Sequence, residues 1–261
     1  MIFRPRKAAL LVCLLLPVNA VAGGMEPLDA LVAAYPEHLV SHTGGALLWT
    51  DGTRTPVSDK VEGKSFDALL ETADIDDMFA IPYRPGPPVG EPALNDDPGR
   101  IRNTAFFVKM YGDCRDGEVA KRLTPVRWID GSTVEVSSVN HLSDRLQSVA
   151  DALAKLPEAN RIFLAPSAGT YNCRVIAETD RMSMHAFGAA IDISTATTDY
   201  WLWNKPDGGR IPYRNKVPFE IVSIFERYGF IWGGKWYHYD TMHFEYRPEL
   251  LLMAGERPVG F

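Results

Sequence analysis

A histidine and an aspartate lie seven residues apart in the sequence SMHAFGAAIDIS at residues 183–194, and this spacing restricts how the chain can fold. Alternate side chains of a strand share one face, so Asp192 would lie on the face of Ala190, with the isoleucines beside it pointing into a core. An odd spacing cannot place His185 on that same face of one straight strand. We therefore expect the chain to turn at Gly188, where the lack of a Cβ atom permits it, and His185 to lie on a loop beside the strand.

A third potential metal ligand lies near the C-terminus, where His243 follows Asp240 by three positions. With His185 and Asp192, His243 completes a set of three protein ligands. Such a set is typical of catalytic zinc, in which a water occupies the fourth position and its pKa falls toward about 7. Asp240 would be the nearby base. A histidine and aspartate pair alone is more often a hydrogen-bonded structural pair, so the prediction depends on the joint pattern.

The joint pattern is Ser-x-His-x-x-Gly-x-Ala-x-Asp, followed about fifty residues later by Asp-x-x-His with a tryptophan and glycine stretch just before it. It resembles the zinc peptidase family of D-alanyl-D-alanine carboxypeptidases and L-alanyl-D-glutamate endopeptidases, which act on bacterial cell-wall peptides. The matching stretches cover most of the chain from 95 to 253: residues 97–100, 110–112, 169–174, 181–192, 200–201 and 229–248.

The resemblance implies that His185, Asp192 and His243 bind Zn²⁺ and that Asp240 is the general base. His238 lies two positions before Asp240, so alternation along a strand would place both side chains on one face. We expect His238 to polarise the substrate or to stabilise the charged intermediate, or else to hydrogen-bond a group that contacts the metal.

Two arginines precede the histidine of the first motif. The resemblance places Arg174, in the sequence Asn-Cys-Arg, where family members keep a substrate-binding arginine, although its connection to His185 is shorter than in many relatives. A guanidinium can grip a carboxylate with two parallel hydrogen bonds. Arg181 offers the same chemistry, or it is a surface arginine paired with Glu178 or Asp180.

We predict an α+β fold in which a small, mostly antiparallel sheet carries the zinc site and helices pack against it, within a catalytic domain of residues 95–261. The predicted function is a zinc metallopeptidase, either a carboxypeptidase or an endopeptidase, that hydrolyses murein peptide bonds involving D-amino acids. The alternative is a non-hydrolytic, zinc-containing cell-wall binding module of the same fold, because folds are reused. The presence of Asp240 favours the enzyme, and a non-murein peptide substrate also fits the ligand set.

Local patterns predict several elements before the first motif. Apolar runs at 104–110 and 161–165 indicate strands, and residues 126–139 indicate a hairpin that turns at an Asp-Gly pair. Apolar residues at three- and four-residue steps predict a helix over 142–156. A second helix is expected between a proline and a glycine over 218–229.

The N-terminus is typical of a secretory signal peptide. Residues 1–22 have a basic start, a short apolar run and the sequence Ala20-Val21-Ala22, so cleavage after Ala22 is expected. An uncleaved anchor is the alternative, but the apolar run is short for a membrane span. We therefore predict a periplasmic or secreted protein without a stable membrane span after cleavage. Residues 23–94 are expected to form an N-terminal extension that wraps the domain, since residues 83–98 are rich in proline and glycine.

The net charge and the cysteines indicate which class of partner the protein binds and in which compartment it acts. Cleavage would remove three of the 27 basic residues and none of the 33 acidic ones, so the net charge would be 24 minus 33, or −9. No basic block is present to follow a phosphate backbone, which argues against a nucleic-acid partner. The partner that the family resemblance implies is a murein peptide. Cys114 and Cys173 would remain, and in an exported protein they indicate one disulfide, with two free buried thiols as the alternative.

Overall fold

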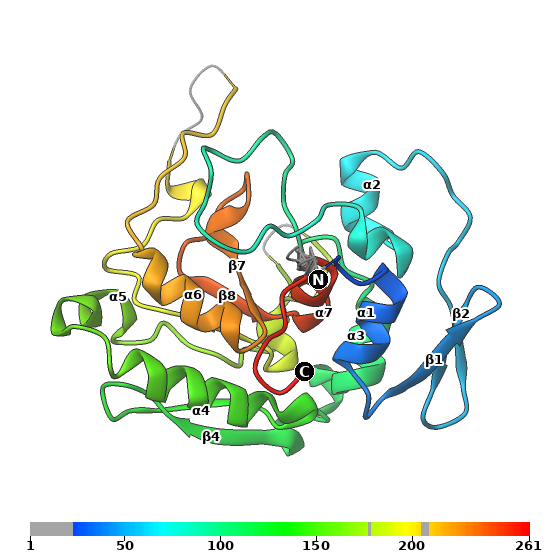
Figure 1. Ribbon diagram of the computed structural model, residues 1–261, viewed down its shortest axis with the longest axis horizontal. Coiled ribbons are helices and arrows are strands. Elements are labelled where there is room, and N and C mark those ends of the chain that lie inside the picture. The colour runs from blue at the N-terminus through cyan, green and yellow to red at the C-terminus, as the bar shows by residue number, and fades with distance from the viewer. Residues whose placement is uncertain (1–22, 177–178, 205–208) are drawn as a thin grey trace, which may run out of the picture.

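The computed structural model describes residues 23–176, 179–204 and 209–261 (Figure 1). The predicted signal peptide, residues 1–22, lies outside this part of the chain. Helices surround three small sheets whose strands all pair antiparallel, and most of the buried apolar side chains form one cluster. The predicted α+β fold is therefore confirmed.

The sheet that matters for the site has the order β6-β8-β7, with β6 at Ala190–Asp192, β7 at Phe230–Trp232 and β8 at His243–Tyr246. Its register pairs Asp192 directly with His243. Residues opposite each other on neighbouring antiparallel strands have adjacent side chains. Two of the predicted metal ligands, 51 positions apart in the sequence, are thus brought side by side by backbone pairing.

Helix α6 (Phe219–Arg227) packs against β7 of this sheet and α4 (Leu142–Leu153) packs against α6, and both helices were predicted. The ring of Phe225 on α6 stacks on Phe244 of β8 with 3.8 Å between ring centroids. Pro218 precedes the first turn of α6, and Gly229 follows its end with a positive φ of 94°. The apolar face of α6 therefore fixes the strand that carries His243.

The predicted hairpin is also present, as β4 (Leu123–Arg127) and β5 (Thr133–Ser137). It lies beside α4 (Figure 1). The hairpin also supports the first motif, because the backbone N–H of Ser137 donates to the carbonyl of Gly188 at 2.9 Å.

Residues 23–94 pack against the rest of the molecule. Helix α1 (Pro27–Ala34) lies against α7 (Pro248–Met253) (Figure 1), and the Tyr35 hydroxyl donates to Glu249 Oε2 at 2.6 Å. The Tyr83 hydroxyl donates to Glu226 Oε1, also at 2.6 Å. Buried hydrogen bonds therefore join this segment to α6 and α7. Its elements are α1 (Pro27–Ala34), β1 (Leu39–Thr43), β2 (Ala46–Trp49), β3 (Arg54–Pro56) and α2 (Phe66–Glu71).

Two expected strands are helices. Residues Thr104–Tyr111 form α3, and Arg161–Leu164 form the short helix α5. The Asn103 side chain caps α3 by accepting from the Phe106 N–H at 2.8 Å, a signal that outweighs a short apolar run. Periodicity alone does not separate a buried strand from a buried helix over so few residues. The strand predictions were wrong for that reason.

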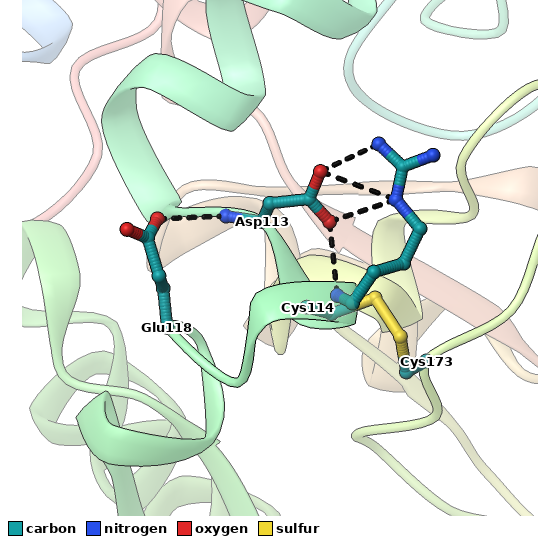
Figure 2. Close-up of a disulfide and its surroundings, with 5 residues drawn as sticks. Asp113, Cys114, Glu118 and Cys173 are labelled. Carbon is teal, nitrogen blue, oxygen red and sulfur yellow. Dashed lines mark hydrogen bonds and ion pairs between the residues drawn. A yellow bond between two sulfur atoms is a disulfide. The ribbon is translucent and has the colours of Figure 1, made fainter.

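The predicted disulfide is confirmed, since Cys114 and Cys173 are bridged across a sequence separation of 59. Figure 2 shows the bridge beside Asp113, whose backbone N–H donates to Glu118 Oε2 at 3.1 Å. The disulfide joins the chain just after α3 to the segment that presents Arg174.

Among the residues that the structure describes, no helix is both long enough and apolar enough to cross a membrane.

Candidate metal centre

The structure brings His185, Asp192 and His243 together. Asp192 Oδ1 lies 3.2 Å from His185 Nε2 and 3.0 Å from His243 Nδ1, and the two nitrogens are 3.2 Å apart. Ligand atoms about 2.0 to 2.1 Å from a tetrahedral zinc ion are about 3.3 Å from one another. The three atoms therefore have nearly the spacing of one face of a zinc coordination tetrahedron.

His185 reaches this position from a short turn. Residues Met184–Phe187 form a 3₁₀ helix that ends at Gly188, whose φ is 62°. A Cβ atom at Gly188 would lie 2.9 Å from the backbone nitrogen of Ser137, so the turn needs glycine for its space as well as its conformation. The turn predicted between His185 and Asp192 is confirmed.

Hydrogen bonds on the far side of each imidazole fix which nitrogen faces the centre. Nδ1 of His185 donates to the carbonyl of Thr170, which leaves the Nε2 lone pair for the centre. Nε2 of His243 donates to Glu245 Oε2 at 3.1 Å, which leaves the Nδ1 lone pair. Histidines that bind metals are usually held in this way by a carbonyl or a carboxylate. The donor set therefore fits a zinc ion.

Glu245 hydrogen-bonds a candidate ligand and was not predicted from the sequence. It is fully buried and accepts hydrogen bonds from Arg102 at 2.9 Å and from Arg247 at 3.2 Å. Burial raises the pKa of Glu245, but the charge of Arg102 and the hydrogen bond from His243 outweigh it and lower the pKa to about 2. The available signal was its position two residues after His243, on the same face of β8.

The charges at the centre stabilise a positive charge between them. Burial lowers the pKa of His243, but hydrogen bonds to Asp192 and Glu245 outweigh this and raise it, so the two carboxylates favour a positive charge here, whether that of a proton or of a metal ion. Burial opposes ionisation of Asp192, yet the charges of His185 and His243 hold its pKa below the usual range. The surroundings thus favour ionised carboxylates around a cation, which is the charge arrangement that a divalent ion requires.

Asp240 lies in the same cleft as the three candidate ligands. Within the part of the chain that the structure describes, its Oδ1 atom is buried and has no hydrogen-bond partner. Burial and then the negative charge of Asp192 raise the pKa of Asp240. A buried, unpartnered carboxylate oxygen with increased proton affinity is what a general base beside a metal site needs.

His238 also lines the cleft, but it does not lie on a strand as expected. Strand β7 ends at Trp232, and a 3₁₀ turn at Gly233–Lys235 leads into the turn that carries His238. Its orientation comes from the buried Asp97, which accepts from the His238 backbone N–H at 2.9 Å and contacts Nδ1 at 2.5 Å. The strand alternation was wrong because glycines interrupt the strand.

The two arginines considered from the sequence have different surroundings. Arg174 lines the cleft and is exposed to solvent. Arg181 is not among the residues that line the cleft, and its Nε atom lies 3.1 Å from Glu71 Oε1 on α2. The expected alternative partner Glu178 lies outside the described residues. The geometry therefore favours Arg174 over Arg181 for substrate contact.

By its fold and its site, the chain is an α+β protein with a candidate His-Asp-His metal centre on an antiparallel sheet. Residues 177–246 match the model of a family described as D-alanyl-D-alanine carboxypeptidase. This segment contains all three candidate ligands and Asp240, so the resemblance seen in the motifs is confirmed there. The match spans 70 of the 261 residues, so the likeness to this peptidase family holds for that segment. Comparisons with curated proteins and with solved structures found no significant match.

Proposed function

We propose that the protein is a zinc metallopeptidase that hydrolyses murein peptide bonds involving D-amino acids. The observation that supports this most is one cleft holding three ligand atoms 3.0 to 3.2 Å apart and the unpartnered carboxylate oxygen of Asp240. The family match over the same segment supports the choice of bond, because its description is that of a D-alanyl-D-alanine carboxypeptidase.

In this proposal the ligands and the general base have separate roles. His185, Asp192 and His243 would hold the ion. A zinc ion held there would polarise a carbonyl and lower the pKa of a water bound to it. Asp240 accepts the proton of the attacking water and returns it to the leaving amine.

The remaining cleft residues orient the substrate. His238 has its Nδ1 engaged by Asp97, so Nε2 is the nitrogen available to a substrate oxygen. Arg174, on the segment tied down by the disulfide, offers a guanidinium to a carboxylate or an oxyanion.

The site of action that we propose is the periplasm or the exterior of the cell. The signal-peptide pattern of residues 1–22 and a disulfide, which persists in oxidising compartments, support export. In this proposal residues 95–261 form the catalytic domain and residues 23–94 an extension packed on it. N-terminal sequencing of the exported protein should find a start at or near Gly23, whereas a start at Met1 would contradict cleavage.

The proposed function is tested by incubating the purified protein with purified murein and reading the products by mass spectrometry. Zinc-loaded protein should release D-amino acids or cut peptides at bonds that involve them. A chelator should stop the reaction and added zinc should restore it. An unchanged murein profile after incubation with zinc-loaded protein would contradict the proposal.

A further inference from the structure

The cleft contains several arginines together with the carboxylates of Asp192 and Asp240. The whole chain has a formal net charge of −6, yet three arginines line the cleft: Arg100, Arg102 and Arg174. Arg102 is neutralised by Glu245, at 2.9 Å. Within the described ranges, neither Arg100 nor Arg174 has a carboxylate within ion-pair distance. The cleft therefore presents two guanidinium groups that no ion pair among the described residues engages.

Arg100 differs from Arg174 because its side chain is held in place. Its Nη1 donates to the carbonyl of His238 at 3.1 Å, and its guanidinium carbon lies 5.6 Å from the ring centroid of Trp236. A planar guanidinium held against an aromatic ring loses little further freedom when it binds an anion. Its remaining N–H groups are preorganised donors.

The backbone before Arg100 is equally constrained. Trp236 Nε1 donates to the carbonyl of Pro98 at 2.6 Å, and Arg247 Nη1 donates to the carbonyl of Gly99 at 2.8 Å. Gly99 has a φ of 89°, and a Cβ atom there would lie 2.4 Å from Ile231 Cδ1. The segment is thus fastened to the turn after β7 and to the chain after β8, which fixes Arg100 relative to the candidate metal centre.

Arg100 also lies close to the reacting groups. It lines the same cleft as Tyr200, Asp240 and the three candidate ligands. In a substrate whose last residue is to be removed, only the amide nitrogen and one α-carbon separate the scissile carbonyl from the terminal carboxylate. A group that binds this carboxylate must therefore share the cleft with the metal and the base, as Arg100 does.

We propose that Arg100 binds the free α-carboxylate of the substrate's last residue, so that the enzyme removes single C-terminal residues and does not cut within peptides. The inference rests on the proposed function and adds the mode of cleavage to it. A different role, stabilisation of the oxyanion, would affect every substrate alike, with or without a terminal carboxylate.

The test compares two synthetic peptides that end in D-alanyl-D-alanine, one with a free carboxylate and one with a C-terminal amide. Wild-type enzyme should prefer the free acid. A hydrogen-bonded pair with a charged group is worth about 10- to 100-fold, so Arg100→Gln should lower kcat/KM on the acid by that factor, mainly through KM. Arg100→Gln should leave kcat/KM on the amide nearly unchanged. Arg100→Lys should keep part of the preference for the free acid over the amide.

The matched control is Arg127→Gln, because Arg127 is an exposed arginine of β4 outside the cleft. It should behave as wild type. Equal cleavage of acid and amide by wild type, or an equal loss on both peptides in Arg100→Gln, would overturn the role of Arg100. Cleavage of internal murein bonds alone would overturn the carboxypeptidase mode while leaving the proposed function intact.

Binding provides a second readout that does not need turnover. Calorimetry on the zinc-loaded Asp240→Asn variant should show about 10- to 100-fold tighter binding of the peptide acid than of the peptide amide. The double variant Asp240→Asn, Arg100→Gln should bind the two peptides equally. Equal affinity for acid and amide with Arg100 present would reject the inference. If wild type cuts neither peptide nor murein while this preference holds, the proposed function fails and carboxylate recognition by Arg100 stands.

Discussion

Nε2 of His243 lies 3.1 Å from Oε2 of Glu245, a fully buried carboxylate two residues further along the same strand. This contact turns the other nitrogen, Nδ1, toward Asp192 on the neighbouring strand. One face of β8 therefore carries both a candidate ligand and the group that orients it. Arg102 and Arg247 keep Glu245 ionised and in place.

We expect Glu245→Gln to weaken zinc binding by about 10- to 100-fold, because partners that orient metal-binding histidines typically have effects of that size. Glutamine keeps the shape but lacks the negative charge that holds the His243 N–H. Competition with a chelator of known affinity measures the change. Glu256→Gln, at an exposed position, is the control. Unchanged affinity in Glu245→Gln would show that Glu245 does not support the centre.

We expect His243→Ala to lower the zinc content well below one ion per chain, because it removes one of three ligands. Elemental analysis of the purified variant measures this, with His141→Ala at an exposed position as the control. Full zinc retention in His243→Ala would require another ligand, such as His238, and would reject the proposed set.

The bridge between Cys114 and Cys173 should stabilise the fold. Closing a loop of 59 residues lowers the entropy of the unfolded chain and contributes about 4 kcal/mol on the chain-entropy model. The double variant Cys114→Ser, Cys173→Ser should therefore unfold at lower denaturant concentration. Two alkylatable thiols in the unreduced wild-type protein would contradict the bridge.

The geometry around His185 could be predicted from the sequence because it follows from local rules. The odd spacing to Asp192 requires a turn, and glycine at 188 provides it. The position of His243 beside Asp192 could not be predicted in this way, because no spacing rule pairs strands that are far apart in the sequence. It was expected from the family resemblance. The register of β6 on β8 then supplied the physical reason.

Other features of the site depend on tertiary contacts that sequence patterns do not contain. The partner of His238 is Asp97, more than a hundred positions away, and Arg100 reaches the cleft through the same distant segment. The strand expected over residues 104–110 is a helix because Asn103 caps it. Short apolar runs and long-range partners are therefore where sequence reasoning failed here.

The most direct test of the central claim is the rate at which Asp240→Asn hydrolyses murein peptides, measured alongside wild type by mass spectrometry. The substitution keeps the size of the side chain but removes the proton acceptor beside the metal centre. General-base catalysis contributes about 10²- to 10⁴-fold, so the variant should keep its zinc and its fold and lose activity by that order. Wild-type rates in Asp240→Asn would contradict the assigned base. Wild-type protein that binds zinc and murein but cuts no bond involving a D-amino acid would instead be a binding module.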